Sequence, residues 1–145
     1  RDITINDLSI VNEKCTGTVY RRLHHVVTEN SRVLNMTLAL ENGDADSAGS
    51  LLYKSHESLR DDFQVSCSEL DLIVDILSKT DGVAGARLTG AGFGGCVIGL
   101  IRNDSLDAVS AAISKKYHSD NIPENVKAEI WPVKISDGAK IINIK

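Results

Sequence analysis

Hydrophobic and polar positions in the first half of the chain repeat with the period of a helix. Apolar side chains recur at intervals of three and four residues, which places them on one face of each segment. The spacing predicts a short helical piece over 7–13 and a long helix over 19–42 that Thr18 caps and Gly43 ends. The apolar stripe of the long helix consists of Val19, Leu23, Val26, Val27, Leu34 and Leu38.

Two more helices are predicted before the pattern changes. Asp44 or Asp46 begins the first of them, and its inward positions are Ala48, Leu51, Leu52 and Leu59. The run Ser66-Cys-Ser-Glu69 predicts a capping box, in which a Ser and a Glu side chain satisfy free backbone donors at a helix start. The helix that follows closes near Gly82, and its apolar positions are Leu70, Ile73, Val74 and Leu77.

The second half of the chain carries strand patterns around one more helix. Val83–Leu88 and Cys96–Ile101 are apolar runs typical of strands, and a helix begins at Asp104 or Ser105. Two further strand candidates are Val126–Ile135, in which Pro132 indicates an edge position or a bulge, and Ala139–Ile144. Helices followed by a β-β-α-β-β order predict an α+β fold, with a small antiparallel sheet covered by helices on one face.

Composition narrows the class of protein. The chain has 145 residues, the size of one domain, with 42% hydrophobic and 25% charged residues. A net charge of −4 argues against nucleic-acid or anionic-membrane partners, and no run of the sequence resembles a membrane span or a signal peptide. Cys15, Cys67 and Cys96 form no Cys-x-x-Cys pair, which indicates neither zinc nor a disulfide framework and favours the cytoplasm.

One glycine-rich segment is the strongest candidate for chemistry. Gly90, Gly92, Gly94 and Gly95 lie between the two predicted strands, where bare backbone can approach a ligand and free N–H groups can converge on an anion. The spacing formally fits a dinucleotide fingerprint, but a strand follows where that motif requires a helix. A Walker P-loop is excluded, and a protein-kinase glycine lid lacks its partner motifs. A glycine hairpin without a ligand stays open on spacing alone.

A polar run in the middle of the chain is a weaker candidate. Ser55–Asp62 contains His56, Asp61 and Asp62, which invite interpretation as metal ligands or an acid–base pair. Their spacing does not place two ligands one turn apart on a common helical face. We therefore interpret the run as helix-surface polarity with one or two interior hydrogen bonds, and His24 and His25 likewise.

Three separated blocks resemble a known family. Tyr20–Asn30, Ser55–Asp71 and Gly82–Cys96, in this order, are similar to the C-terminal half of galactokinases, which are GHMP small-molecule kinases. The closing Ser136-Asp-Gly-Ala139 resembles their last hairpin, so the likeness covers essentially the whole chain. Ser68 stands where a Pro is common in that family and Phe63 where a Tyr is common, and neither departure touches the glycine loop.

The resemblance implies a ferredoxin-like GHMP C-terminal domain over residues 1–145 and an enzyme that transfers the γ-phosphoryl group of ATP to galactose with Mg²⁺. The loop facing the cleft beside the phosphates would then be Thr89, Gly90, Ala91, Gly92, Phe93, Gly94 and Gly95. The family's sugar-binding motif, phosphate loop and catalytic Asp are not in this sequence. We therefore expect no catalytic or metal-ligating residue in this chain, no cofactor bound to it alone, and no activity without an N-terminal lobe.

Three alternatives stay open on the sequence. The same fold could serve a kinase for another sugar, such as N-acetylgalactosamine, or a non-catalytic sensor of galactose and ATP. A third alternative is an unrelated ligand-binding module. If another lobe packs on this chain, apolar residues should be open to water without it, with Phe93 as the candidate, and the isolated domain could dimerise through that face.

Overall fold

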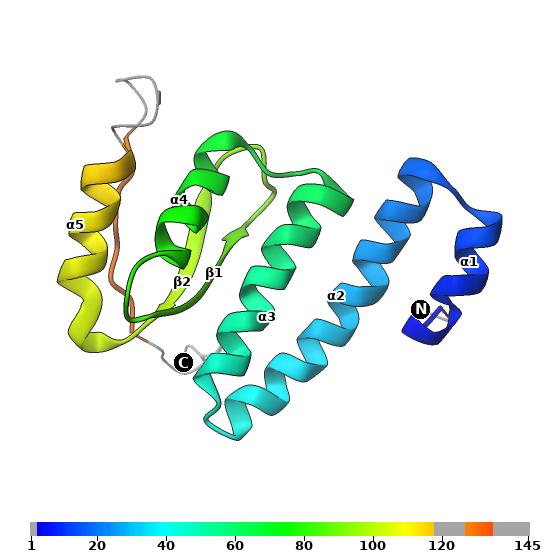
Figure 1. The fold of residues 1–145 in the computed structure, drawn as a ribbon, viewed down its shortest axis with the longest axis horizontal. Coiled ribbons are helices and arrows are strands. Elements are labelled where there is room, and N and C mark those ends of the chain that lie inside the picture. Colours follow the sequence, from blue (N-terminus) through cyan, green and yellow to red (C-terminus); the bar gives the residue numbers. More distant parts are fainter. Residues whose placement is uncertain (1–2, 118–126, 135–145) are drawn as a thin grey trace, which may run out of the picture.

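The computed structural model describes residues 3–117 and 127–134 of the chain, and it sets a pair of long helices beside a two-stranded antiparallel sheet (Figure 1). The helices and strands in chain order are η1 Ile5–Asp7, α1 Leu8–Lys14, α2 Gly17–Glu41, α3 Ala45–Ser58, the π-helix η2 Leu59–Phe63, α4 Ser68–Ser78, β1 Val83–Thr89, β2 Cys96–Ile101, η3 Asn103–Ser105 and α5 Leu106–Tyr117. The α+β class predicted from the pattern is confirmed.

The helical hairpin of α2 and α3 begins and ends close to the predicted positions. The predicted cap Thr18 is wrong: α2 begins at Gly17, and the Thr18 hydroxyl accepts a hydrogen bond from Arg21 inside the helix. The far end is as predicted, because Gly43 has a φ of +66° that favours glycine. Asp44 then caps α3 by accepting a 2.9 Å hydrogen bond from the Ser47 N–H.

Most residues of the apolar stripe predicted for α2 face solvent rather than the core. Val27 is buried, but Val19, Val26, Leu34 and Leu38 are large apolar side chains exposed to solvent. The face of α2 that meets α3 and β1 instead carries polar side chains that pair with one another. Periodicity therefore located the helix but assigned its interior to the wrong side.

The start of α4 also differs from the prediction. The helix begins at Ser68 with Cys67 as its N-cap, so the predicted capping box between Ser66 and Glu69 does not form. The Ser66 hydroxyl donates to the Asp71 carboxylate at 2.5 Å instead, and Ser68 donates to Glu69. Because Ser66 lies one residue before the cap, its side chain is better placed for Asp71 than for the backbone donors of the first turn.

The core lies between the sheet and the helices α4 and α5. Its buried members are Val74, Ile76, Leu77, Ala86, Val109, Ile113 and Tyr117. Strands β1 and β2 pair antiparallel, with Arg87 opposite Ile98 and Thr89 opposite Cys96, as the sequence predicts. Residues 127–134 form no strand, so the candidate over 126–135 is not borne out in its described part. The candidate over 139–144 lies outside the described residues.

Helix α3 crosses β1 in backbone contact. A Cβ added to Gly49 of α3 would stand 1.9 Å from the Ala84 carbonyl oxygen, and one added to Gly85 would stand 2.2 Å from the Gly49 oxygen. Paired glycines thus let the helix lie directly on the strand that leads into the glycine loop. Over the described residues, no helix is both long and apolar enough to cross a membrane.

Candidate functional site

The glycine segment forms the connection between β1 and β2, and nearly all of it has left-handed backbone. The φ angles are +88° at Gly90, +83° at Gly92, +57° at Phe93, +123° at Gly94 and +105° at Gly95. Such angles strain residues with a Cβ, which explains why the sequence places glycine at four of these five positions. At its glycines the loop therefore presents backbone without side chains, as the glycine spacing predicts.

The loop rests on the segment that precedes α4. The Phe93 N–H donates a 2.6 Å hydrogen bond to the Val65 carbonyl, and a Cβ on Gly92 would lie only 2.2 Å from that same oxygen. By contrast, a Cβ on Gly90 or Gly94 would meet no atom within 4 Å. One side of the loop is thus seated on the protein, and the other side is open.

Phe93 is the large apolar side chain of this loop. It is 75% exposed despite being a phenylalanine with positive φ. A bulky residue in the left-handed region costs on the order of 1 kcal/mol or more, and an exposed ring recovers little of that by packing. The exposure agrees with the apolar surface predicted at Phe93, whereas its role in docking stays a prediction.

A buried histidine supports the base of the loop. His56 of α3 is 2% exposed, and its Nδ1 accepts a 3.3 Å hydrogen bond from the Leu88 N–H of β1. Its Nε2 lies 3.2 Å from the Asp71 carboxylate of α4. Because Nδ1 accepts, the neutral ring carries its proton on Nε2, toward Asp71. His56 therefore ties α3, β1 and α4 together just before Gly90.

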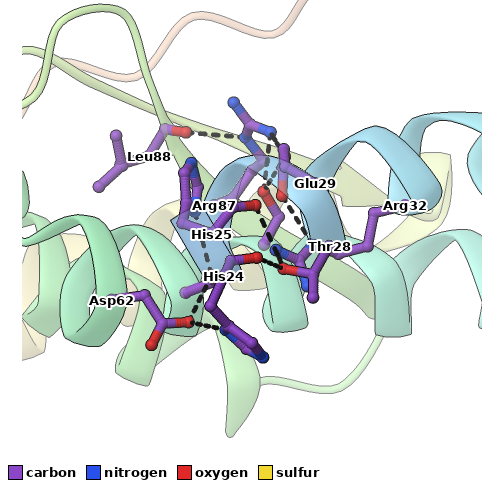
Figure 2. Close-up of polar contacts among 10 residues, drawn as sticks. His24, His25, Thr28, Glu29, Arg32, Asp62, Arg87 and Leu88 are labelled. Atoms are coloured by element: carbon purple, nitrogen blue, oxygen red, sulfur yellow. Dashed lines mark hydrogen bonds and ion pairs between the residues drawn. The ribbon is translucent and has the colours of Figure 1, made fainter. Parts of the chain in front are cut away.

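A second polar cluster joins α2, α3 and β1 (Figure 2). Arg87 of β1 donates from Nη1 to Glu29 at 3.0 Å and to the Ser55 hydroxyl at 2.9 Å, and from Nε to the Leu88 carbonyl at 2.9 Å. Glu29 also accepts from Ser55 and from Arg32, each at 2.6 Å. Burial opposes the charge on Glu29, but these hydrogen bonds outweigh it, so the pKa of Glu29 lies below its ordinary value.

A series of hydrogen-bonded side chains holds η2 against α2. His24 Nδ1 lies 2.9 Å from Asp62 Oδ2, the Ser58 hydroxyl donates to the same oxygen at 2.8 Å, and His25 Nδ1 lies 3.0 Å from Ser58. The His25 ring also stacks on Phe63, with centroids 4.6 Å apart. Because Val65 lies two residues after η2 and its N–H donates to the Leu59 carbonyl of η2, this cluster holds the carbonyl on which the glycine loop rests.

These contacts refine the interpretation of the polar run. His56 is buried and Asp62 is partly buried, and both are hydrogen-bonded, in agreement with the one or two interior hydrogen bonds predicted for this run. The described residues hold no group of three His, Cys, Asp or Glu side chains arranged for a metal ion. Sequence reasoning missed the pairing of Glu29, Arg32 and Arg87. The available signal was Arg87 itself, a charged residue between Ala86 and Leu88 in a strand that is otherwise apolar.

Stability should fall in mild acid because two buried imidazoles resist protonation. Burial lowers the pKa of His25, which faces Glu29, Asp62, Arg32 and Arg87. The unfolded chain therefore binds more protons than the folded chain as pH drops through the ordinary histidine range near about 6.5. The contribution of His25 to the free energy of unfolding is therefore fully present above that range and declines as pH falls from it to the lower pKa of the folded state.

Stability should depend on pH in the same direction through His56. Burial lowers the pKa of His56 as well, and the charged groups that face it are Asp71, Arg60 and Asp61. Urea unfolding at a series of pH values between about 8 and 5 measures the effect, and His25→Gln combined with His56→Gln should flatten it. A wild-type stability that stayed constant or rose on acidification would contradict this assignment.

Comparisons with known proteins give the context of this geometry. A family model described as GHMP kinases C terminal matches residues 36–119. The galactokinase of Thermosipho africanus strain TCF52B is 41% identical over 119 residues, which are 82% of this chain and 33% of that protein. The structure of Lactococcus lactis galactokinase complexed with galactose aligns with a TM-score of 0.78 and 35% identity over 81% of this chain and 31% of that one.

A more distant structure has the same fold. Mevalonate kinase of L. major in complex with R-mevalonate aligns with a TM-score of 0.60 and 28% identity, over 81% of this chain and 35% of that one. The chain thus spans about a third of the length of each of these relatives.

Proposed function

The chain belongs to the GHMP kinase family, and from this membership we propose that it acts as the C-terminal lobe of a galactokinase. The observation that carries the proposal is the ranking of the relatives. Identity and structural overlap are both higher for galactokinase, at 35% and 0.78, than for mevalonate kinase, at 28% and 0.60. The reaction is transfer of the γ-phosphoryl group of ATP to galactose.

The glycine loop is the part of this chain to which we assign a role in that reaction. Its outer side presents backbone without side chains at Gly90, Gly94 and Gly95, and no charged residue lies in the loop. Backbone N–H dipoles in such a turn favour an anion, and a fixed loop costs no reorganisation when charge develops. We propose that the loop borders the phosphates and that its anchor at Val65 keeps it in place.

We propose ATP and Mg²⁺ as the cosubstrate and metal ion of the whole enzyme. Bound Mg²⁺ would neutralise phosphate charge, but no trio of ligating side chains for it exists among the described residues. We assign the chain a positioning role beside the phosphates, which the open side of the glycine loop supports. The cysteines Cys15, Cys67 and Cys96 are free thiols, which fits the reducing cytoplasm that we propose for the enzyme.

A chimeric enzyme tests the proposal. The region of Lactococcus lactis galactokinase that aligns with this chain is replaced by the chain, and galactose-dependent ADP formation is measured. We expect activity within about 100-fold of the parent enzyme, because a misplacement of about 1 Å in such a site costs about that factor. The chain alone should form no ADP with galactose.

Mevalonate serves as the control substrate, and thermal unfolding shows that the chimera is folded. A folded chimera that is inactive with galactose, or that prefers mevalonate, would contradict the assignment. Galactose-dependent turnover by the chain alone would contradict the positioning role.

A further inference from the structure

The glycine loop is fixed to the rest of the chain by two contacts, one at its base and one within it. At the base, the Leu88 N–H donates to Nδ1 of His56, and the Leu88 carbonyl accepts from Arg87 (Figure 2). The Leu88 side chain is 1% exposed, so its backbone and its side chain are both held. Within the loop, the Phe93 N–H donates to the Val65 carbonyl. We call these contacts the Leu88 anchor and the Phe93 anchor.

A single carboxylate oxygen of α4 connects the two anchors. Oδ1 of Asp71 accepts a 2.5 Å hydrogen bond from the hydroxyl of Ser66, the residue that directly follows Val65. The same Oδ1 lies 3.2 Å from Nε2 of His56. The segment that carries the Phe93 anchor and the ring that carries the Leu88 anchor therefore meet at one atom.

The carboxylate also determines which nitrogen of the ring carries the proton. His56 is 2% exposed, with a backbone N–H beside Nδ1 and a carboxylate oxygen beside Nε2. The neutral tautomer that suits both neighbours has its proton on Nε2 and leaves Nδ1 as an acceptor. Nε2 is not well aligned on Oδ1 for a hydrogen bond, so the attraction there is that of a charge for a dipole. Asp71 thus keeps His56 in the state that holds Leu88.

We propose that His56 and Asp71 are positioning residues of the glycine loop, which keep its two anchors in one fixed relation. The place of the loop beside the phosphates rests on the proposed function, whereas the coupling of the anchors does not. The geometry favours coupling, because the imidazole is rigid, the side chains of Ser66 and Asp71 are short, and Asp71 lies in the first turn of α4. A shift of about 1 Å in a reacting site costs about 100-fold in rate, so the fixed relation matters for turnover.

Two amide replacements of His56 separate the roles of its ring nitrogens. Asn places its side-chain oxygen near the position of Nδ1 and still accepts from Leu88, whereas Gln reaches the position of Nε2 and leaves the Leu88 N–H without an acceptor. Amide hydrogen exchange of the 145-residue chain measures both anchors. His56→Gln should accelerate exchange about tenfold at Leu88 and about fivefold at Phe93, although the ring bonds Leu88 rather than Phe93. His56→Asn should change either rate less than about threefold.

A merely structural role of His56 has a different signature in the same experiment. The amide of Val74, in the buried core, exchanges through global unfolding and reports overall stability. Faster exchange at Val74 with exchange at Phe93 unchanged in His56→Gln would mean that the ring stabilises the fold without coupling the anchors. That result would overturn the inference.

Ser66→Ala tests the coupling from the other end and leaves the buried ring in place. It removes the hydroxyl that joins Asp71 to the segment preceding α4, and it should accelerate exchange at Phe93 about tenfold. Ser68→Ala is the matched control, because Ser68 lies two residues further on, is exposed and donates to Glu69 instead. It should leave exchange at Phe93 unchanged. Equal exchange at Phe93 in the two variants would overturn the coupling.

Kinetics of the chimeric galactokinase test the consequence for the reaction. With His56→Gln, kcat should fall about 100-fold while KM for galactose changes less than about threefold, because the loop borders the phosphates in the proposed function. His56→Asn should recover kcat to within about fivefold of the parent chimera, since it restores the acceptor for Leu88. Equal kcat values for the two variants would overturn the positioning role. An inactive parent chimera would overturn the proposed function, and exchange at Phe93 would still decide whether the anchors are coupled.

Discussion

Gly49→Ala should destabilise the chain by about 3 kcal/mol, the largest effect we expect from the addition of a single methyl group. Its Cβ would stand 1.9 Å from the Ala84 carbonyl oxygen and 2.9 Å from the Gly85 nitrogen, and both are backbone atoms that no rotamer change can move. Helix α3 would have to lift away from β1, which loosens the packing of Ala86 and Leu88. Urea unfolding followed by circular dichroism measures the loss.

Ser50→Ala is the matched control for this substitution. Ser50 is the next residue of α3 and is exposed, so alanine there changes only helix propensity, by about 0.5 kcal/mol in the stabilising direction. Gly49→Ala gains about 1 kcal/mol in helix propensity, so a net loss of stability in that variant reflects the contact with β1. A Gly49→Ala chain as stable as wild type would mean that α3 and β1 are not in backbone contact.

Local signals explain which parts of this fold could be predicted from sequence. The strands β1 and β2, and the bend between them, are set by short apolar runs and by glycines whose positive φ is a property of the residue itself. The last residues of α2 and the start of α3 were predictable from local signals as well, through the positive φ of Gly43 and the side-chain cap of Asp44. These features need no knowledge of the rest of the molecule.

The buried face of α2 could not be predicted from its periodicity, because residues on two of its faces satisfy helical spacing. The choice between them depends on Arg87, a residue far along the chain that pairs with Glu29, which in turn pairs with Arg32. Likewise, the capping box at Ser66 failed because Asp71 offers its hydroxyl a stronger partner. Both errors arise where tertiary pairing competes with a local rule.

The candidate site also has one part that was predictable from sequence and one part that was not. The loop from Thr89 to Gly95 was located from sequence, since glycine spacing is visible there. Its anchor was not, because a carbonyl oxygen such as that of Val65 leaves no mark on residue identity. The support of the loop by His56 required the tertiary structure for a similar reason, since only the folded chain brings α3 beside Leu88.

Gly92→Ala should break the contact between the glycine loop and Val65 and lower the free energy of unfolding by about 2–3 kcal/mol. The strain of a Cβ at positive φ contributes about 1 kcal/mol, and the loss of the Phe93–Val65 hydrogen bond contributes about another 1 kcal/mol. Overlap of the Cβ with the Val65 oxygen, at 2.2 Å, forces that bond to break rather than stretch. Urea unfolding measures the stability, and amide hydrogen exchange at Phe93 reports the broken bond directly.

Gly90→Ala separates backbone strain from the lost contact. Its φ of +88° is nearly that of Gly92 at +83°, but its Cβ would meet no atom within 4 Å. We expect this control to lose only about 1 kcal/mol and to leave exchange at Phe93 unchanged. Equal losses of unfolding free energy in Gly90→Ala and Gly92→Ala would mean that Val65 does not hold the loop. Faster exchange at Phe93 in Gly92→Ala alone would show that one side of the loop is bound to the protein and that the opposite side is the one left open, as the proposed role beside the phosphates requires.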